Sequence, residues 1–304
     1  MTDLPIKFRH LRTFVEVARQ RSVGRAAEIL HVSQPAVTKT LRELEAAVGA
    51  KLVERAGRGI RLTEAGEVFL QHSGASLAAI QRGLDSVART RSGPPLRIGA
   101  LPTVSARIMP PAILRFLARR TGTLVRIITG ENVVLLEQLR LGQLDLVVGR
   151  LAAPEQMAGL NFAHLYAEPV RFVVRAGHPL LGQAPLDFSR IHDFLVLMPS
   201  EGSVIRPFVE RFLIEHGVGD LRSEIETVSD SFGRAMVRQT DAVWIISEGV
   251  VASDLEEGTL VALAVDTAET RGAVGLTTRA NIPFPPAVDL LSQIVRETVG
   301  QFGL

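Results

Sequence analysis

Four polar side chains in one short segment have the types and spacing needed to read a nucleic acid. They are Gln34, Thr38, Lys39 and Arg42, and at helical spacing they share one face of a helix. The other face carries the apolar residues Ala36, Val37, Leu41, Leu44 and Val48. Amide, hydroxyl and basic groups donate hydrogen bonds to base edges and phosphates when such a helix lies in a major groove. The segment therefore predicts a recognition helix.

The residues before this segment predict the elements that hold the helix in place. A preceding helix carries the apolar residues Ala26, Ala27, Ile29 and Leu30. His31 and Val32 then form a tight connection. Ser33 stands where an N-cap belongs, and Pro35 falls just inside the next helix, where its missing N–H is not needed. The pattern predicts a helix-turn-helix, and the alternative is an amphipathic hairpin packed within a core.

Residues 52–63 predict two short strands around a Gly-rich turn. Arg55, Arg58 and Arg61 are spaced to project from this ribbon. A wing of this kind places arginines against phosphates or an adjacent minor groove. A surface hairpin whose arginines serve solubility is the alternative, and the neighbouring helix-turn-helix argues against it.

The predicted DNA contacts fall into two groups. We expect Gln34, Pro35 and Thr38 to meet bases. Phosphates or groove edges would be held by Ser33, Lys39, Arg42, Arg55 and Arg58.

Residues 10–66 resemble the N-terminal domain of the LysR-type transcriptional regulators. The matching features are Phe14, Ala26, Ala27, Ser33, Gln34, Pro35, Ala36, Val37, Leu44, Glu45, Leu52, Arg55, Leu62, Thr63, Ala65 and Gly66. Val53 departs from the pattern, because the family usually has Phe there, and Lys39 replaces the commoner Arg. Lysine lacks the bidentate fork of arginine, so a phosphate or single-acceptor contact is expected at Lys39. The resemblance implies a mostly α-helical winged helix-turn-helix that binds double-stranded DNA at an interrupted inverted repeat.

The composition fits a chain with a substantial core. The 304 residues are 46% hydrophobic and 22% charged, which suits two or three domains. The absence of cysteine excludes a disulfide framework and a thiolate metal site. Charged residues recur from Asp3 to Arg12 in place of an apolar signal segment, and no stretch has the length of a membrane span. We therefore expect a cytoplasmic protein without a membrane partner.

The net charge of +2 is unevenly distributed. Residues 1–92 contain 15 Lys and Arg against 9 Asp and Glu, whereas the rest of the chain contains 19 against 23. The predicted helix-turn-helix thus lies in the positive part of the chain, as expected for electrostatic attraction to DNA.

Residues 64–90 contain no proline and predict a long exposed helix. A seam of heptad type consists of Leu70, Ser73, Leu77, Ile80, Leu84 and Val87. In LysR-type regulators the linker helix pairs with that of a second subunit, so the resemblance implies a homodimer or a homotetramer. Gly74 and Gly83 weaken the helix, and a helix docked on its own domain is the alternative.

Ser92, Gly93, Pro94 and Pro95 break this helix and predict a domain boundary. Beyond it, strands are indicated at 96–100, 124–129 and 144–149, and helices at 106–120 and 132–141. This βαβαβ pattern is typical of a mostly parallel sheet. A second unit has strands at 170–175, 194–198, 223–227 and 242–246, and helices at 204–215 and 232–239. The strand at 272–278 and the helix at 286–302 return to the first unit.

The resemblance to LysR effector domains implies a two-lobed, periplasmic-binding-protein-like α/β fold, with chain crossings near 165–170 and 265–269. The predicted organisation is a winged helix-turn-helix domain (1–65), a linker and dimerisation helix (66–92) and an effector-binding domain (93–304). Lobe I comprises 93–166 and 268–304, and lobe II comprises 167–267.

Ligands of such sheets bind in the crevice beyond the carboxyl ends of the strands. Hydroxyls and free N–H groups there suit a small carboxylate, and an arginine adds a bidentate fork. The candidate effector-binding residues are Thr103, Ser105, Thr129, Arg150, Ser200, Ser203, Arg206 and Phe232. Ser105 and Ser203 have the alternative role of helix caps, and Arg150 and Arg206 that of solvated surface residues.

A finer resemblance concerns the effector. Residues 8–23, 26–45 and 57–77 look like the LysR subgroup that activates protocatechuate catabolism in the β-ketoadipate pathway. That subgroup implies an activator that responds to a carboxymuconate-type polycarboxylate. Regulators of sugar-uptake genes have similar N-termini and are the alternative. A sugar calls for Asp, Asn or aromatic groups in the cleft, and the chain has one Trp and one Tyr, which favours an anion.

Catalysis finds no support in the sequence. The seven His residues are scattered, and no His-Glu-x-x-His helix, phosphate-binding loop, dinucleotide fingerprint or Gly-x-Ser-x-Gly elbow is present. We expect no enzymatic activity, no cofactor and no metal, and we interpret His178 and Asp145 as structural residues. A solute-binding protein that dimerises through its N-terminal helices is a further alternative, which the lack of a secretory signal disfavours.

The predicted mechanism couples the two ends of the chain. A carboxylate in the cleft would change the relative pose of the two lobes and shift an equilibrium of the oligomer. The linker helices would pass this change to the DNA readers, so that DNA bending and contact with RNA polymerase change.

Overall fold

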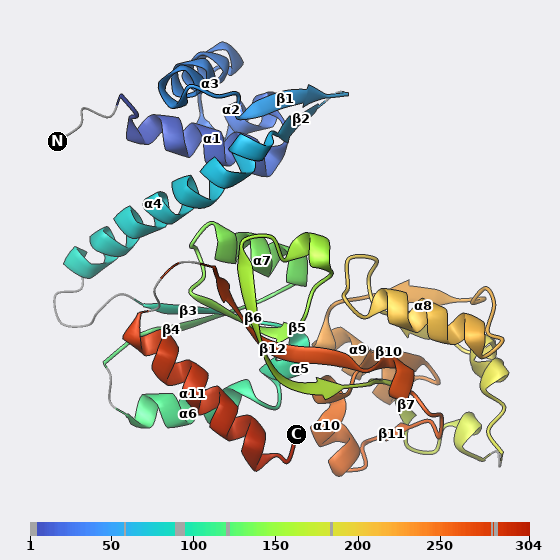
Figure 1. Ribbon diagram of the computed structural model, residues 1–304. Helices are drawn as coiled ribbons and strands as arrows, with labels where there is room; N and C mark the ends of the chain where they lie inside the picture. Colours follow the sequence, from blue (N-terminus) through green and yellow to red (C-terminus); the bar gives the residue numbers. More distant parts are fainter. Residues whose placement is uncertain are drawn as a thin grey trace. The chain divides into compact units, whose positions relative to one another are not determined.

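The computed structural model describes residues 5–57, 59–88, 95–119, 122–182, 185–280, 282 and 285–304 (Figure 1). The chain forms two compact units: the N-terminal unit ends before Pro95 and includes the short segment 140–143, and the second unit comprises the remainder. The domain boundary predicted at 92–93 lies outside the described residues. No helix in the described ranges is long and apolar enough to cross a membrane.

Three helices begin the N-terminal unit: α1 (Phe8–Gln20), α2 (Val23–Leu30) and α3 (Gln34–Val48). His31 ends α2 in the left-handed conformation, with φ of 56°. Ser33 caps α3, since its Oγ accepts a hydrogen bond from the Ala36 N–H at 3.4 Å, and Pro35 lies in the first turn. The predicted cap and turn are confirmed.

The core of this unit is built from residues that the helical spacing placed inside. Phe14, Leu44 and Leu52 are fully buried, and burying each such side chain contributes about 1.5–3 kcal/mol. Ala36 was expected on the buried face but is exposed together with Gln34 and Pro35, because burial along α3 begins only at Val37.

The wing consists of two antiparallel strands, β1 (Val53–Ala56) and β2 (Gly59–Leu62). Helix α4 (Glu64–Ala88) follows at once, and its Phe69 ring packs against Phe14 with centroids 5.5 Å apart. Gly66 is required where α4 passes the wing, because a Cβ there would overlap the Leu52 carbonyl oxygen. Further along α4, Ile80 and Leu84 of the predicted heptad seam are exposed.

Lobe I of the second unit is a five-stranded sheet in the order β4-β3-β5-β12-β6. Its strands are β3 (Leu96–Ala100), β4 (Val125–Thr129), β5 (Leu146–Arg150), β6 (Leu160–Glu168) and β12 (Gly272–Arg279). Helices α6 (Met109–Ala118) and α11 (Pro286–Gln301) pack side by side on one face of the sheet, and α7 (Asn132–Arg140) covers the other (Figure 1).

Lobe II is a second five-stranded sheet, in the order β11-β7-β10-β8-β9. Its strands are β7 (Val170–Arg175), β8 (Val196–Met198), β9 (Glu224–Glu226), β10 (Val243–Ser247) and β11 (Leu260–Ala262). Helix α8 (Arg206–Glu215) covers one face, and α9 (Asp230–Gln239) and α10 (Glu248–Glu256) cover the other, where Trp244 is buried.

Short helices complete the connections. In lobe I, α5 (Pro102–Ser105) follows β3, and η1 (Pro154–Gln156) follows β5. In lobe II, η2 (Pro179–Gly182) and η3 (Phe188–Asp193) lie between β7 and β8. The crossing that precedes β12 contains η4 (Ala268–Thr270).

Each five-stranded sheet has four strands in one direction and one strand against them, so the expectation of mostly parallel sheets is confirmed. Strand β12 runs antiparallel to both β5 and β6, and β7 runs antiparallel to both β10 and β11. The reason is that each lobe receives strands from the crossings between lobes, which enter against the direction of the βαβ strands. The crossings are Pro169, between β6 and β7, and residues 263–271, between β11 and β12.

Asp145 anchors the entry of β5, as interpreted from the sequence. Its Oδ2 accepts a hydrogen bond from the Arg97 N–H at 2.9 Å, and its own N–H donates to the Arg97 carbonyl at 2.8 Å. The two bonds fix β5 against β3, and this register carries Arg150 to the far end of β5.

Candidate functional site

Helix α3 presents a hollowed polar face in the N-terminal unit. The shallow groove of about 490 Å³ is lined by Gln34, Pro35, Thr38, Lys39, Arg42 and Glu43. Five of the predicted DNA-binding residues therefore share one face, while Val37, Leu41 and Leu44 are buried beneath them. Thr38 Oγ1 donates to the Gln34 carbonyl at 3.1 Å, which fixes the hydroxyl beside Gln34.

Glu43 is the acidic member of this groove, and two residues of α1 engage its carboxylate. His10 Nε2 lies 3.2 Å and Arg9 Nη2 lies 3.3 Å from Glu43 Oε2. The hydrogen bond from His10, followed by that from Arg9, lowers the pKa of Glu43 below its ordinary value. Its negative charge is thus countered from α1, which leaves Lys39 and Arg42 available to an anionic partner.

Glu45 ties the wing to the recognition helix. Its side chain is 8% exposed and accepts hydrogen bonds from the Leu52 N–H at 3.0 Å and the Val53 N–H at 3.4 Å. Lys51 Nζ lies 2.6 Å from its second oxygen. One buried carboxylate on α3 therefore sets where β1 begins.

The arginines of the wing have different surroundings. Arg55 is exposed and has no ion pair within the described ranges, whereas Arg61 Nε lies 2.7 Å from Glu54 Oε1 on the opposite strand. Arg58, which the sequence predicts to bind DNA, lies outside the described residues. Arg55 and Ser33 are exposed, so both can donate hydrogen bonds to DNA in addition to the residues of the α3 face.

The second unit contains a cavity of about 570 Å³ between its two lobes. Lobe I lines it with residues that follow β3, β4 and β5, and lobe II with residues that follow β8, β9 and β10. The cavity thus lies beyond the carboxyl ends of six strands, where the sequence analysis expected a ligand.

Six of the eight predicted effector-binding residues line this cavity: Thr103, Ser105, Thr129, Arg150, Ser200 and Ser203. The lining, as far as the described residues go, does not include Arg206 or Phe232. Arg206 instead donates to Glu210 and Glu226 at 2.7 and 2.8 Å and to the Pro199 carbonyl at 2.8 Å. Phe232 is at N3 of α9, one residue past the cavity-lining Ser231, and is 41% exposed.

Arg150 is the innermost cation of the cavity and is 4% exposed. Its Nη2 donates to the Glu168 carbonyl at 2.7 Å, and its Nη1 lies 3.4 Å from the Thr270 carbonyl. The Glu168 carbonyl directly precedes the Pro169 crossing, and the Thr270 carbonyl lies in the 263–271 crossing. Burial lowers the pKa of Arg150 and the Glu168 carboxylate opposes this, and a guanidinium keeps its charge under such conditions.

Three buried polar atoms of cavity-lining residues have no hydrogen-bond partner among the described residues. They are Arg150 Nε, Ser200 Oγ and Asn132 Oδ1. Native proteins rarely leave such atoms unpaired, because each unmade hydrogen bond is costly in a buried site. Two of the three can donate, so an acceptor such as a carboxylate oxygen would satisfy them.

Sequence reasoning missed a second group of lining residues. Glu131 and Asn132 follow β4, and Ser229, Asp230 and Ser231 open α9. The signal was present for α9, because Ser229 caps that helix by accepting from the Phe232 N–H at 3.3 Å. Starting the helix at its cap would have placed residues 229–231 at the cavity.

The charges of the lining are unevenly arranged. Arg234 is engaged by Asp254 at 2.9 Å, and burial raises the pKa of Asp230. Glu131 also lies on the wall, so its carboxylate would repel a negative charge on the part of the ligand that faces it. The arrangement favours a ligand whose anionic group lies at the Arg150 end.

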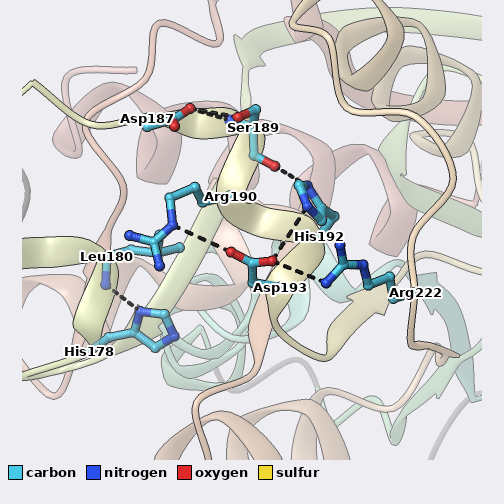
Figure 2. Close-up of polar contacts among 8 residues, drawn as sticks. All are labelled: His178, Leu180, Asp187, Ser189, Arg190, His192, Asp193 and Arg222. Carbon is cyan, nitrogen blue, oxygen red and sulfur yellow. Dashed lines mark hydrogen bonds and ion pairs between the residues drawn. The ribbon is translucent and has the colours of Figure 1, made fainter.

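His178 has structural contacts that occupy both ring nitrogens. Its Nδ1 accepts from the Leu180 N–H at 3.1 Å (Figure 2). Its Nε2 lies 3.0 Å from the Asp241 carbonyl, which requires Nε2 to donate. The ring is therefore neutral, in keeping with burial lowering the pKa of His178. The interpretation of His178 as a turn residue agrees with these contacts.

Asp193 gathers several basic side chains at the surface of lobe II. Figure 2 shows its carboxylate between Arg190, His192 and Arg222, each 3.4 Å away. Exposed ion pairs of this kind contribute about 0–1 kcal/mol each. The cluster joins Arg222 to η3, and none of its residues is among the described residues that line the cavity.

Comparisons with known proteins identify both units. Residues 8–67 match the family model described as the bacterial regulatory helix-turn-helix protein of the lysR family, and residues 89–300 match the LysR substrate binding domain. The chain is 61% identical over 303 residues to the HTH-type transcriptional regulator PcaQ of Agrobacterium fabrum, covering 99% of this chain and 97% of that protein. It is 38% identical over 296 residues to the uncharacterized HTH-type transcriptional regulator YdcI of Escherichia coli, covering 97% and 96%.

Solved structures agree with this assignment. A full-length OxyR variant from Pseudomonas aeruginosa has a TM-score of 0.60 at 26% identity, covering 96% of this chain and 95% of that one. Full-length LysG from Corynebacterium glutamicum, solved with a bound arginine effector, has a TM-score of 0.60 at 21% identity, covering 97% and 99%, and is similar in fold. The chain is thus a regulator that binds DNA and a small-molecule effector, and it belongs to the LysR family of bacterial transcriptional regulators.

Proposed function

We propose that this protein activates protocatechuate-catabolic genes when a small carboxylate of that pathway occupies the interlobe cavity. The observation that supports a carboxylate ligand is the buried Arg150 at the inner end of the cavity, whose Nε makes no hydrogen bond within the described residues. The pathway rests on the sequence resemblance to protocatechuate activators, together with 61% identity to PcaQ over nearly the whole chain.

The sugar-uptake alternative is not favoured. Of the groups that a sugar calls for, Asn132 and Asp230 line the cavity, but the described residues of its wall include no Trp, Tyr or Phe on which a sugar ring could stack. A solute-binding protein without a DNA function would not need the exposed polar face of α3 or the arginines of the wing.

A thermal-shift titration of the full chain tests the effector class. We expect one acid among protocatechuate, muconate and carboxymuconate to raise the melting temperature, and galactose to leave it unchanged. A ligand at a hundred times its Kd stabilises the folded state by about 2.7 kcal/mol. No shift with any acid, or a shift with galactose alone, would refute the carboxylate assignment.

DNA recognition is proposed to divide between base and phosphate contacts. Gln34→Ala should cost about 1–3 kcal/mol at the promoter and relax sequence preference. Arg55→Ala should weaken all DNA equally and lower the salt slope by about one. Arg61→Ala is the matched control, since Arg61 is already paired with Glu54 and should change the slope less. Fluorescence anisotropy on promoter and scrambled duplexes over a range of salt measures all three, and equal losses of specificity would contradict the division.

The proposed assembly is a homodimer or homotetramer that places two α3 helices on an interrupted inverted repeat. The exposed Ile80 and Leu84 of α4 suit a helix that pairs with that of a second copy. Effector binding would alter the spacing of the DNA readers and, through it, DNA bending and contact with RNA polymerase. Sedimentation of the full chain distinguishes the dimer from the tetramer.

A further inference from the structure

The carboxylate of Glu168 lies directly behind the cavity wall and joins the two lobes. Glu168 ends β6, just before the Pro169 crossing, and is 4% exposed. Its Oε1 accepts a hydrogen bond from the Thr103 hydroxyl of α5, in lobe I. Its Oε2 accepts one from the Gly249 N–H of α10, in lobe II, at 3.1 Å. One buried carboxylate therefore receives a donor from each lobe.

Gly249 permits this arrangement. A Cβ at this position would overlap the Thr103 carbonyl oxygen and would lie 2.8 Å from Glu168 Oε2. Helix α10 therefore approaches α5 backbone to backbone, and only glycine leaves room for the carboxylate between them. The contact is built into the fold and does not depend on a mobile side chain.

The direction of the Thr103 hydrogen bond conflicts with binding an anion. Thr103 lines the cavity, but a hydroxyl has a single proton, and Thr103 gives it to Glu168. While that bond lasts, Thr103 offers only lone pairs to a ligand. A carboxylate ligand would then meet a hydroxyl acceptor backed by a second carboxylate, which is repulsive.

A proton on Glu168 removes the conflict. A neutral Glu168 donates its O–H to Thr103 Oγ1, and the Thr103 proton is then free to point into the cavity. The other oxygen of Glu168 still accepts from the Gly249 N–H, so the joint between the lobes is kept. The hydrogen-bond chain then runs from Glu168 through Thr103 to the ligand.

We propose that Glu168 is a positioning residue for the effector, and that a carboxylate binds with uptake of one solvent proton by Glu168, which turns the Thr103 hydroxyl toward the ligand. This inference rests on the proposed role of the cavity as a carboxylate site. Glu168 acts through Thr103 and does not itself touch the ligand.

The groups around Glu168 suit a proton exchange near neutral pH. Burial raises the pKa of Glu168 to about 7, against the opposing attraction of Arg150, whose Nε lies 3.8 Å from Oε1. Glu248 of α10 raises the pKa further, and Arg107 lowers it. Tyr166 on β6 is neutral, since burial and Glu168 raise its own pKa far above the ordinary value. An anion that binds beside Arg150 competes for the same cation and so favours the protonated form.

Calorimetric titration of the full chain with carboxymuconate between pH 6.5 and 8.5 tests the proton uptake. The carboxyls of the probe are ionised throughout this range. We expect Kd to rise about tenfold between pH 7 and 8.5, because Glu168 must be reprotonated before the ligand binds. Titrations at pH 7.5 in phosphate and in Tris should give different heats, which reports the proton directly. Binding without pH dependence or proton uptake would refute the role of Glu168 alone. No binding at any pH would refute the assignment of the cavity as a carboxylate site.

Variants distinguish proton uptake by Glu168 from a purely structural role of this side chain. Glu168→Gln has the polarity of the protonated carboxyl, since its amide donates to Thr103 and its oxygen accepts from Gly249. Its Kd should be independent of pH and at least as low as that of the wild type at pH 7. Thr103→Ser should keep the proton uptake, and Thr103→Val should lose it with weaker binding. Glu248→Gln, at a carboxylate paired with Arg171 at 2.6 Å, should keep the proton uptake but move the pH dependence to lower pH, because Glu248 raises the pKa of Glu168. A Glu168→Gln protein with the wild-type pH dependence would refute the proposal.

Discussion

Replacing Arg150 with Met is expected to abolish the effector response and to lower the free energy of unfolding by about 3–5 kcal/mol. The guanidinium is buried and bonded to the Glu168 carbonyl, just before the Pro169 crossing, and to the Thr270 carbonyl in the second crossing. Its loss would leave both carbonyls without this donor and the Glu168 carboxylate without its nearby cation. The ligand would also lose the cation that the cavity presents to it.

Urea denaturation followed by Trp244 fluorescence measures the stability. Trp244 is the only tryptophan of the chain and is buried in lobe II. Calorimetry with carboxymuconate measures binding. Arg150→Lys keeps the charge but has no planar fork to reach both crossings, so an intermediate stability is expected.

Arg206→Met is the matched control for this prediction. Arg206 was also predicted to bind the effector, but its guanidinium is engaged by Glu210 and Glu226 near the surface of lobe II. Its removal should change stability by about 1 kcal/mol and leave the Kd of carboxymuconate unchanged. If Arg206→Met abolished binding and Arg150→Met did not, the cavity would have been assigned to the wrong cation.

Replacing Glu45 with Ala is expected to detach the wing from α3, to destabilise the N-terminal unit by about 2–3 kcal/mol and to weaken promoter binding at least tenfold. The buried N–H of Leu52 would be left without an acceptor, and an unsatisfied buried donor costs about 1–3 kcal/mol. The Val53 N–H and Lys51 lose the same partner. Arg55 would then no longer be held at a fixed distance from the α3 face. Anisotropy on the promoter duplex and thermal unfolding measure the two effects.

Glu45 also predicts a pH dependence of stability. Burial alone would raise its pKa, but the hydrogen bonds from Lys51, Leu52 and Val53 outweigh it, so the pKa lies below the ordinary value. A carboxyl with a lowered folded pKa stabilises the protein above its unfolded pKa and loses this effect as the pH falls below about 4.5. Glu54→Gln, at an exposed position, is the control and should leave the acid transition of the N-terminal unit almost unchanged.

The N-terminal unit could be predicted in detail because its signals are local. Ser33 and Pro35 fix the start of α3 within a few residues, and the apolar spacing fixes its buried face. The anchoring of the wing by Glu45 was not predicted, since the donors lie seven and eight residues away and the pairing depends on a turn. Ala36 was misplaced because helical spacing alone gives no information on where the packing partners end.

The cavity could be predicted only in part, because it depends on contacts distant in the sequence. The strand ends placed Thr103, Thr129 and Ser200 correctly at the cavity wall. Arg206 was misplaced because its partner Glu226 lies on β9, a strand twenty residues further along. Strand β6 was missed, since it is an edge strand with a partly exposed face and no clear run of apolar residues. The α10 helix was missed with it, so Glu168 and Gly249, which the two elements carry, were not recognised.

The order of the strands in lobe I has a consequence for synthesis of the protein. Strand β12 lies between β5 and β6, and α11 covers the same sheet, yet both come from the end of the chain. Lobe II therefore leaves the ribosome whole while β5 and β6 each still have an unpaired edge. Such edges are templates for aggregation. Premature termination after lobe II should therefore yield an insoluble chain rather than a DNA-binding regulator that ignores its effector.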